Sequence, residues 1–198
     1  MRSPRERMVV SAALLIRERG AHATAISDVL EHSGAPRGSA YHYFPGGRTQ
    51  LLEEAVDYAG AYIAAKISAA PNALDLLDGL VDDYRHQLIR SDYRAGCPIV
   101  AVTVEAGDPD STERSTKLIE RTAAVFEHWT HLIGQRLVAE GVAASRAEEL
   151  AMLVTTSIEG AIVIARAFRD VKPLDLVHHQ LRVLLQAESA ERNPRDDQ

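Results

Sequence analysis

Apolar residues recur at three- and four-residue spacing along nearly the whole chain, which is the period of an amphipathic α-helix. No alternating apolar and polar run is followed by a turn and a second such run, so no β-hairpin is predicted. The sequence therefore predicts an all-α protein, in which three short helices precede a larger helical bundle. About nine helices are expected, near residues 4–19, 25–33, 37–44, 48–69, 73–90, 99–104, 112–140, 146–169 and 174–187.

The segment 99–104 is the one place where the pattern fits two structures. Its alternation of Val with Ala and Thr is compatible with a strand. A lone strand would have no pairing partner in an otherwise helical chain, so a short buried helix is expected instead.

Residues that start helices stand at several predicted boundaries. Ser3 and Glu6 form a capping box, with proline at the first helical position. Thr24 is the expected N-cap of the second helix, because a threonine hydroxyl accepts an orphan backbone N–H. Ser145 and Glu148 have the spacing of a second capping box, at the start of the long helix near residue 146.

Residues 24–48 read as two short helices joined by a tight turn. Gly34 ends the first helix and Pro36 starts the second, whose positions Ala40 and Phe44 lie four apart and face inward. The outward residues include a cation, a hydroxyl, two phenols and an imidazole, but no carboxylate. Such a face, at the start of a helix with free N–H groups, suits a phosphate backbone and is typical of a helix-turn-helix. The outward residues are Arg37, Ser39, Tyr41, His42 and Tyr43.

The segment from Gly34 to Arg48, together with Gly96-Cys97-Pro98, resembles the LmrA/YxaF-like branch of the TetR-family transcriptional regulators. In that family a glycine, a short turn and an aromatic Tyr-x-x-Phe helix recur. Two positions depart from the common pattern: Pro36 replaces a serine cap, and Gly46-Gly47-Arg48 replaces a Ser-Lys pair. Arg48 is expected to take over the phosphate contact of that lysine. The resemblance implies DNA contacts from Thr24, Ser27, Pro36, Arg37, Gly38, Ser39, Tyr41, His42, Tyr43 and Arg48, although one of the two tyrosines is expected to pack inside.

The resemblance also divides the chain into three parts. Residues 1–47 are expected to form the DNA-binding domain and residues 48–187 a domain for ligand binding and dimerisation. Residues 188–198 are polar, and a frayed tail is expected there.

The charge distribution agrees with a polyanion partner at one end of the chain. The first 50 residues hold seven arginines and no lysine against four acidic residues, an excess of three positive charges. The whole chain carries −6, so residues 51–198 carry −9. This positive excess is modest, so charge alone is weak evidence for DNA binding.

Composition excludes several other classes of protein. The single cysteine, Cys97, rules out an internal disulfide framework, and it is expected to be a buried structural residue. No dinucleotide-binding glycine pattern, phosphate loop or cysteine cluster occurs, so no cofactor and no metal are expected. With no signal peptide and no apolar run near 18 residues, a soluble cytoplasmic protein without membrane contact is expected.

The segment 145–169 is apolar on nearly every side, which predicts burial on more than one side. One side is expected to face the core and another a second copy of the chain. The expected dimer interface comprises Val154, Ile158, Ala161, Ile162, Ala165, Phe168, Val177, Leu181 and Leu184.

A ligand pocket is expected in the larger domain, chiefly because the family is ligand-responsive. Its candidates are the aromatic, polarizable and hydrogen-bonding residues Tyr58, Tyr62, Tyr84, Cys97, Phe126, Trp129, Met152, Thr155, Thr156 and Glu159. For any one of them an ordinary core position is the commoner outcome. Glu159 stands out, since a buried carboxylate needs a proton or a partner, such as a ligand cation, a ligand hydroxyl or Arg166.

Two further clusters have a plain explanation. Asp75, Asp78, Asp82 and Asp83 resemble a metal cluster but are expected to be a solvated acidic face. His128 and His131 lie three apart on one helix, a spacing that occurs more often on a surface than at a metal.

The resemblance implies a ligand-responsive regulator, most simply a repressor. It would bind a pseudo-palindromic duplex operator as a homodimer and release it when a lipophilic small molecule binds. The alternative is a small helical ligand carrier or enzyme that uses Glu159 with His128 or His131 as acid–base groups. That alternative leaves the N-terminal unit unexplained.

Overall fold

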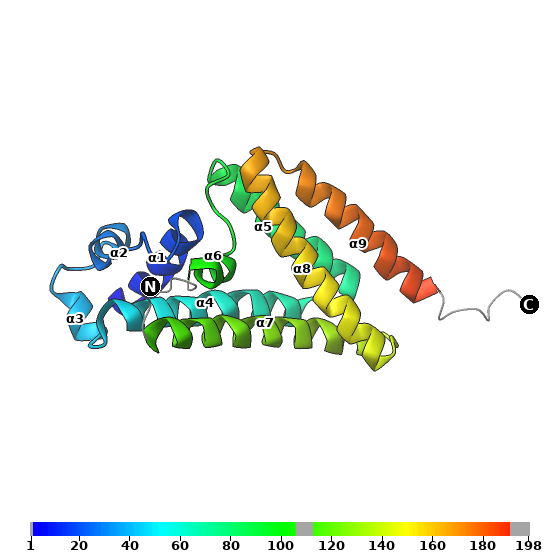
Figure 1. Cartoon of the computed structure of the whole chain (residues 1–198), viewed down its shortest axis with the longest axis horizontal. Helices are drawn as coiled ribbons and strands as arrows, with labels where there is room; N and C mark the ends of the chain where they lie inside the picture. The colour runs from blue at the N-terminus through cyan, green and yellow to red at the C-terminus, as the bar shows by residue number, and fades with distance from the viewer. Residues whose placement is uncertain (1, 106–112, 191–198) are drawn as a thin grey trace, which may run out of the picture. The chain divides into compact units, whose positions relative to one another are not determined.

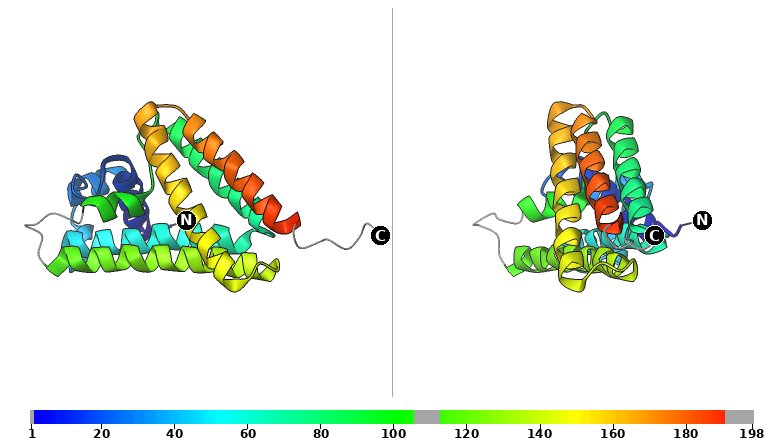
Figure 2. Two further views of the ribbon diagram at one scale, coloured as in Figure 1. Left: turned by 45° about the vertical axis from the view of Figure 1, so that its right-hand side comes forward. Right: turned by 90° about the vertical axis from the view of Figure 1, so that its right-hand side faces the viewer.

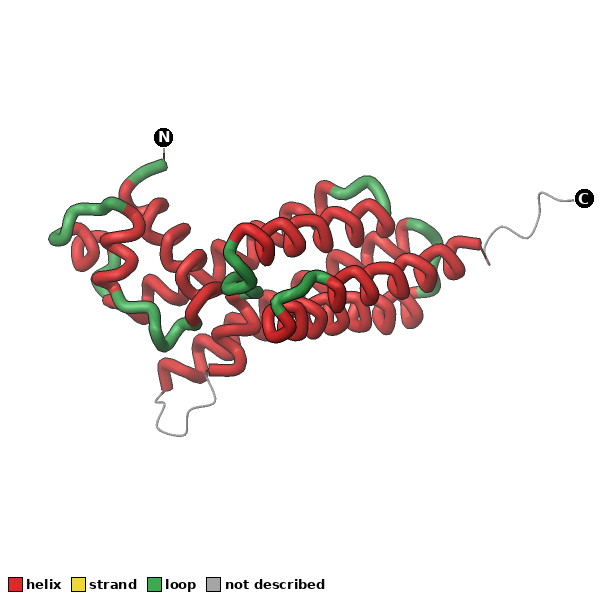
Figure 3. Tube along the Cα trace, turned by 90° about the horizontal axis from the view of Figure 1, so that it is seen from above, coloured by secondary structure: helices red, strands yellow, loops and turns green. Residues whose placement is uncertain are grey.

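The computed structural model describes residues 2–105 and 113–190, and the regular structure of this part of the chain is entirely helical (Figure 1). The all-α prediction is therefore confirmed. Within the described ranges the helices are α1 (Pro4–Arg19), α2 (Ile26–Ser33), α3 (Ser39–Tyr43), α4 (Gly47–Ala69), α5 (Ala73–Arg90), α6 (Pro98–Glu105), α7 (Glu113–Ala139), α8 (Ala144–Phe168) and α9 (Lys172–Ala190). Between consecutive helices whose connection is described, Figure 3 shows only loops and turns, and residues 98–105 are helical as expected.

The start of α1 is the capping box that the sequence predicts. The Ser3 hydroxyl accepts a hydrogen bond from the Glu6 N–H at 3.2 Å, and the Ser3 N–H donates to a Glu6 carboxylate oxygen at 2.7 Å. These hydrogen bonds lower the pKa of Glu6 below its ordinary value. The second predicted box is wrong, because α8 begins one residue before Ser145 and its N-cap is Ala143, without a side-chain cap.

Thr24 does not cap α2. Its side chain is buried, and its hydroxyl donates to the Gly20 carbonyl at 2.7 Å. The N-cap is Ala25, whose N–H donates to the Asp28 carboxylate at 3.2 Å. An acidic side chain in the first turn therefore supplies the cap from inside the helix.

The helices form two compact units. Unit 1 consists of residues 1–62 and 94–125, and unit 2 of residues 63–93 and 126–198. Helices α4 and α7 each contribute residues to both units. Each unit combines two stretches that lie far apart in the sequence. In unit 1, α1 packs against α6, and Arg121 of α7 pairs with Asp57 of α4.

Unit 1 is built around α1, which packs against α2 and α6. The Gly96 N–H donates to the Arg17 carbonyl at 2.8 Å and fixes the chain before α6 against α1. Farther along α4, a Cβ on Gly60 would lie 2.7 Å from a Val125 methyl group, so α4 and α7 approach closely there. The largest fully buried side chains of this unit are Met8, Ile16, Val29, Phe44, Leu51 and Ile99.

Unit 2 is a bundle in which α5, α8 and α9 lie side by side, as Figure 2 shows. Its core residues come from the inward faces of these helices and from the C-terminal parts of α4 and α7. The largest fully buried side chains of this unit are Ile67, Leu77, Leu88, Leu150, Ile162 and Leu174.

Helix α8 is long and apolar enough to cross a membrane by length and composition. The expectation that no segment reaches this threshold is therefore wrong. One such helix is weak evidence for a membrane span, because core helices of soluble proteins pass the same test. One face of α8 is buried against its own unit, through Leu150, Val154, Ile158, Ala161, Ile162 and Ala165.

The C-terminal end differs from its prediction as far as it can be followed. Helix α9 continues to Ala190, so residues 188–190 are helical rather than frayed. The rest of the predicted tail lies outside the described residues.

Candidate functional site

The turn between α2 and α3 sets the position of the candidate recognition helix. Gly34 ends α2 with a left-handed backbone (φ +63°), which glycine adopts without strain. The Pro36 carbonyl then accepts hydrogen bonds from the Ser39 N–H at 2.9 Å and the Ser39 hydroxyl at 2.6 Å. Because residues 36–38 are used in this turn, α3 spans Ser39–Tyr43 and is shorter than the predicted 37–44.

Two side chains fix α3 to unit 1. Ala40 and Phe44 are 1 % exposed, as their four-residue spacing predicts. The Arg5 guanidinium lies 5.3 Å above the Phe44 ring and pairs with Glu54 of α4 at 2.7 Å. Helix α3 is therefore held between α1 and the first turns of α4.

The remaining side chains of α3 form the candidate nucleic-acid interface. Tyr41 is 73 % exposed, and His42 is exposed and contacts the Tyr43 ring edge to face, with centroids 5.1 Å apart. Tyr43 is half-buried, so one of the two tyrosines is partly inside, as expected. A face with phenol, imidazole and hydroxyl groups but no carboxylate can approach phosphate and base edges without charge repulsion.

Arg37 differs from its neighbouring arginines in having no partner within the described part of the chain. It is exposed and makes no hydrogen bond or ion pair there. In contrast, Arg7 donates to the Ser33 carbonyl at 3.1 Å, and Arg19 pairs with Asp28 at 2.6 Å. The positive charge next to α3 is thus available to an external anion.

Arg48, a predicted phosphate contact, is engaged by backbone carbonyls of its own unit. Its guanidinium donates to the Thr24 carbonyl at 2.8 Å, to the His22 carbonyl at 3.2 Å and to the Ala21 carbonyl. These bonds fasten the turn between α1 and α2 to the start of α4. Their acceptors are backbone carbonyls, which every residue carries, so no pattern of residue types predicts these bonds.

Among the other predicted DNA contacts, Thr24 is only 1 % exposed, and its hydroxyl donates to the Gly20 carbonyl. Ser27 and Pro36 are exposed. Gly38 is exposed with an ordinary backbone (φ −79°), and a Cβ added there would meet no atom within 4 Å. The glycine is therefore not required by packing inside the chain.

Comparison with known proteins identifies this architecture. Residues 9–55 match the family model of bacterial regulatory proteins of the tetR family, and residues 73–180 match the LmrA/YxaF-like C-terminal domain of transcriptional regulators. The HTH-type transcriptional regulator Rv0196 of Mycobacterium tuberculosis is 66 % identical over 98 % of this chain and 100 % of its own length. The chain belongs to the TetR family, in its LmrA/YxaF-like branch.

Other relatives of this TetR-family regulator agree. LmrA of Bacillus subtilis is 28 % identical over 86 % of this chain and 90 % of its own length. The crystal structure of a TetR transcriptional regulator from Legionella pneumophila has a TM-score of 0.79 at 19 % identity, covering 93 % of this chain and 98 % of that chain. At that identity the structure establishes the fold alone. The relatives and the family are transcriptional regulators, not enzymes.

The regulator has a small cavity in unit 2. Its volume is about 20 Å³, enough for roughly one water molecule. Four of the predicted pocket residues, Tyr84, Trp129, Thr155 and Glu159, lie in its wall. The other lining residues are aliphatic and were not predicted: Ile63, Ile67, Leu80, Ile133, Val154 and Ile158.

Six predicted pocket residues do not line this cavity. Phe126 instead packs edge to face on Trp129, with centroids 5.5 Å apart. Met152 is 53 % exposed on the outer face of α8, and Thr156 is exposed with its hydroxyl bonded to the Met152 carbonyl at 2.8 Å. The remaining three belong to unit 1, where Tyr58 is half-buried, Tyr62 is exposed and Cys97 is buried.

The predicted dimer interface of the regulator is mostly its own core. Val154, Ile158, Ala161, Ile162, Ala165 and Leu181 are each less than 5 % exposed within one chain, and Val177 and Leu184 are half-buried. Among these nine residues only Phe168 is largely exposed to solvent, at 71 %. The apolar residues that face outward are Met152, Leu153, Val163 and Ile164 of α8 and Leu176 and Val183 of α9.

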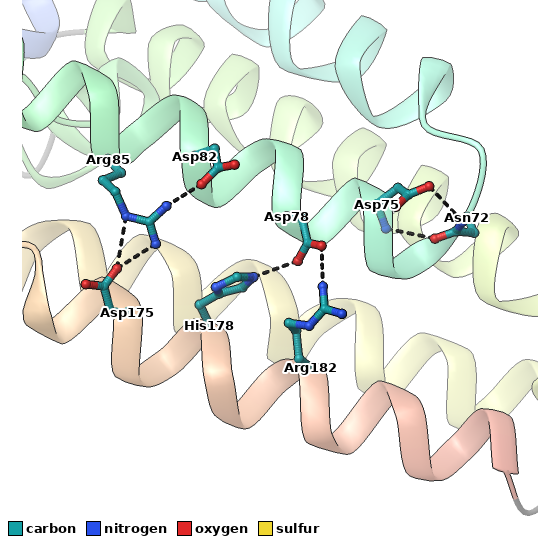
Figure 4. Close-up of polar contacts among 8 residues, drawn as sticks. All are labelled: Asn72, Asp75, Asp78, Asp82, Arg85, Asp175, His178 and Arg182. Atoms are coloured by element: carbon teal, nitrogen blue, oxygen red, sulfur yellow. Dashed lines mark hydrogen bonds and ion pairs between the residues drawn. The ribbon is translucent and has the colours of Figure 1, made fainter.

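The acidic residues of α5 are paired and not simply solvated, which corrects the sequence prediction. Figure 4 shows Asp78 between His178, at 2.7 Å, and Arg182, both on α9. Burial raises the pKa of Asp78, but hydrogen bonds from Arg182 and His178 lower it more, so the pKa lies below its ordinary value. Elsewhere along α5, Asp75 bonds Asn72, Asp82 bonds Arg85, which also reaches Asp175 at 2.6 Å, and Asp83 pairs with Lys66.

The histidines of the enzyme alternative are not assembled with the carboxylate. His128 and His131 are exposed on α7, whereas one carboxylate oxygen of Glu159 is fully buried. Within residues 2–105 and 113–190, no group of three or more His, Cys, Asp or Glu side chains is placed to hold a metal ion.

Proposed function

We propose that this regulator binds a pseudo-palindromic duplex operator as a homodimer and represses transcription in the cytoplasm. It leaves the DNA when a small lipophilic molecule binds in unit 2. The observation that carries the DNA-binding part is the outward face of α3, where Arg37, Tyr41 and His42 are exposed and no carboxylate interrupts them. Two such helices in a symmetric dimer would enter successive major grooves, about 34–36 Å apart.

The proposed dimer is supported by the outward apolar residues of α8 and α9. Met152 and Val163 lie three helical turns apart, as do Leu153 and Ile164, so they follow one face of α8. Leu176 and Val183 lie two turns apart on α9. Exposed apolar residues that follow one helix face are typical of a protein interface, and a two-fold axis would pair this face with itself.

The proposed effector response is supported by the path of α4. This helix begins four residues after α3 ends, and its later residues Ile63 and Ile67 line the cavity of unit 2. A ligand that enlarges the cavity displaces these side chains and so acts on the helix that leads back to α3. A coupling of about 1–3 kcal/mol is sufficient for a useful change in operator affinity.

The proposal is tested by measuring DNA affinity of the purified protein across a salt series. The DNA is selected from genomic fragments and includes the regulator's own promoter. Tight binding that weakens steeply with salt is expected, because released counterions dominate such binding. Arg37→Ala removes one phosphate contact per protomer, so the salt slope of a dimer should fall by roughly 2. Tyr41→Ala should weaken specific binding without a comparable change in slope.

Arg90→Ala is the matched control, since Arg90 is an exposed arginine of α5. It should leave both affinity and slope unchanged. The experiment is repeated on protein that has been unfolded and refolded, which removes any molecule carried through purification. Absence of salt-sensitive specific binding in both preparations would overturn the proposed function, as would an equal loss from Arg90→Ala.

A further inference from the structure

Two charged side chains from later helices hold the turn between α1 and α2, residues 20–25. Glu105, the last residue of α6, accepts a hydrogen bond from the His22 N–H at 2.7 Å. The His22 carbonyl accepts a hydrogen bond from the Arg48 guanidinium of α4 at 3.2 Å. These side chains lie 83 and 26 positions away from His22 in the sequence. The conformation of the turn therefore depends on α4 and α6 as well as on its own residues.

The close approach of Glu105 depends on the glycine at position 20. Gly20 has a positive φ of +89°, which other residues rarely adopt. A Cβ added there would lie 1.7 Å from one carboxylate oxygen of Glu105, while the other oxygen accepts the His22 N–H. The hydrogen bond and the close packing are therefore two parts of one contact, and a side chain at position 20 would displace the carboxylate.

Helix α6 is fixed to the end of α1 from both of its own ends. Before its first residue, the Gly96 N–H donates to the Arg17 carbonyl at 2.8 Å, and at its last residue Glu105 binds the turn. Between these two anchors, Ile99 and Val102 are at most 1 % exposed. A displacement of α6 against α1 would therefore move the Glu105 carboxylate relative to the turn.

The turn leads into α2, and α2 leads into the candidate recognition helix α3. Arg19 of α1 pairs with Asp28 of α2 at 2.6 Å. Arg7 of α1 donates to the Ser33 carbonyl, at the end of α2, at 3.1 Å. These contacts lie within the helix-turn-helix segment, whereas Glu105 contributes a contact from a helix outside it. A shift of α6 would therefore reach α2 and α3 through the turn.

We infer that Glu105 is a positioning residue for DNA binding: its carboxylate holds the turn between α1 and α2, and through α2 it sets the orientation in which α3 meets the operator. The inference rests on the proposed function in taking α3 as the DNA contact. A carboxylate repels phosphate, so Glu105 acts through the turn and not on the DNA. Its removal would by charge alone favour DNA binding, and a loss of affinity would therefore indicate positioning.

The test measures the affinity of the full-length protein for the duplex that genomic selection yields. Glu105→Ala removes the acceptor of the His22 N–H in each protomer, so affinity should fall about tenfold. Glu105→Gln retains an oxygen at the same distance from the backbone and should stay within about twofold of the unaltered protein. Glu105→Asp retains the charge but withdraws both oxygens from the turn, so it should lose about fivefold.

Glu120→Ala is the matched control, because Glu120 is an exposed glutamate of α7 in the same unit and its removal changes the net charge equally. Its affinity should equal that of the unaltered protein or exceed it slightly. Circular dichroism and urea unfolding establish that each variant is folded under the conditions of the binding measurement. Glu105 is exposed, so the fold is expected to survive its substitution.

Gly20→Ala tests the same contact from the other side. Its Cβ displaces the Glu105 carboxylate, so this variant should lose at least as much affinity as Glu105→Ala. Because both substitutions break one contact, the double variant should lose no more than Gly20→Ala alone. The three Glu105 variants decide the question even if Gly20→Ala fails to fold.

Three results would overturn the inference: unchanged affinity in Glu105→Ala, a loss in folded Glu105→Gln as large as in Glu105→Ala, or losses that multiply in the double variant. Its failure is separable from failure of the proposed function. Salt-sensitive operator binding that depends on Arg37, together with any of these results, would leave the regulator and remove the role of Glu105. Absence of operator binding in the unaltered protein would remove both.

Discussion

Helices α3 and α8 present two different kinds of surface that are exposed within residues 2–105 and 113–190. Helix α3 has five residues and is fixed by Ala40 and Phe44, and its exposed face is polar and lacks acids. Helix α8 has 25 residues, and its exposed face is apolar, from Met152 to Phe168. A short helix with an exposed polar face suits insertion into a DNA groove. A long exposed apolar face suits a stable interface with another protein chain.

The comparison shows which property of each surface is informative. An exposed polar face is ordinary for a helix, so polarity alone says little about α3. The absence of a carboxylate beside the unpaired Arg37 is the unusual part. Burial of one face of α8 is likewise ordinary, and the second apolar face, on the side away from the core, is the unusual part.

The largest expected effect comes from a charge placed on the open face of α8. Ile164 is 46 % exposed in the single chain, so Ile164→Asp should leave the fold of the protomer intact. In a symmetric dimer it places two unpaired carboxylates in the interface, which costs about 3 kcal/mol or more. The dissociation constant of the dimer, measured by sedimentation equilibrium, should rise at least a hundredfold.

Val104→Asp is the matched control, because Val104 of α6 is 73 % exposed and lies on a different unit. Its dissociation constant should equal that of the unaltered protein. A dimer that tolerates Ile164→Asp would show that the interface lies on another face, and the outward apolar face of α8 would then not be the dimer contact.

The sequence predicted that α8 has two apolar faces, but most of the α8 residues that it assigned to the dimer interface are buried within one chain. Val154, Ile158 and Ala165 are aliphatic, as are Val163 and Ile164. Helical periodicity separates the two sets into different sides of α8, but it does not tell which side is turned to solvent. That choice depends on where α5 and α9 pack, which is a tertiary property. The buried spacing of Ala40 and Phe44 was predictable because α3 has only one apolar side.

The polar contacts of the site were predictable to a smaller extent. Exposure of Arg37 and Tyr41 followed from a local pattern, and the structure agrees. The bonds of Arg48 to backbone carbonyls, and of Asp78 to α9, join segments far apart in sequence and have no local signal. The aliphatic lining of the cavity was missed for the same reason, since such residues look like plain core.

The next largest effect separates two arginines that look alike in the sequence. Arg48→Ala removes charged hydrogen bonds to the turn after α1, so the free energy of unfolding should fall by about 2 kcal/mol. Arg37→Ala removes no contact within the described chain and should change it by less than about 0.5 kcal/mol. Urea unfolding measures both. Equal stability losses would show that Arg37 is structural and would weaken the case for α3 as the DNA contact.

Gly38→Ala sharpens the interpretation of the α3 surface. The backbone there suits alanine, and the added Cβ meets no atom of the chain, so stability should be unchanged or slightly higher. If DNA approaches this backbone closely, operator affinity should fall about tenfold, or about 1.4 kcal/mol. Gly79→Ala, a glycine of α5 whose Cβ would also meet open space, is the matched control for the binding measurement. Unchanged operator affinity in Gly38→Ala would show that DNA does not approach this turn closely.

The smallest expected effect concerns the ion pairs that join α5 to α9. Because the folded-state pKa of Asp78 lies below its ordinary value of 3.8, ionised Asp78 stabilises the folded chain above that pH. The stabilisation is lost as pH falls through the lower folded-state pKa. Asp78→Asn should therefore reduce the free energy of unfolding by up to about 1 kcal/mol at pH 7, since the pair is partly exposed. The difference from the unaltered protein should vanish at the acid end of a urea-unfolding series, whereas Glu148→Gln should show no such trend. A difference that persists in acid would assign the role of Asp78 to packing and not to its charge.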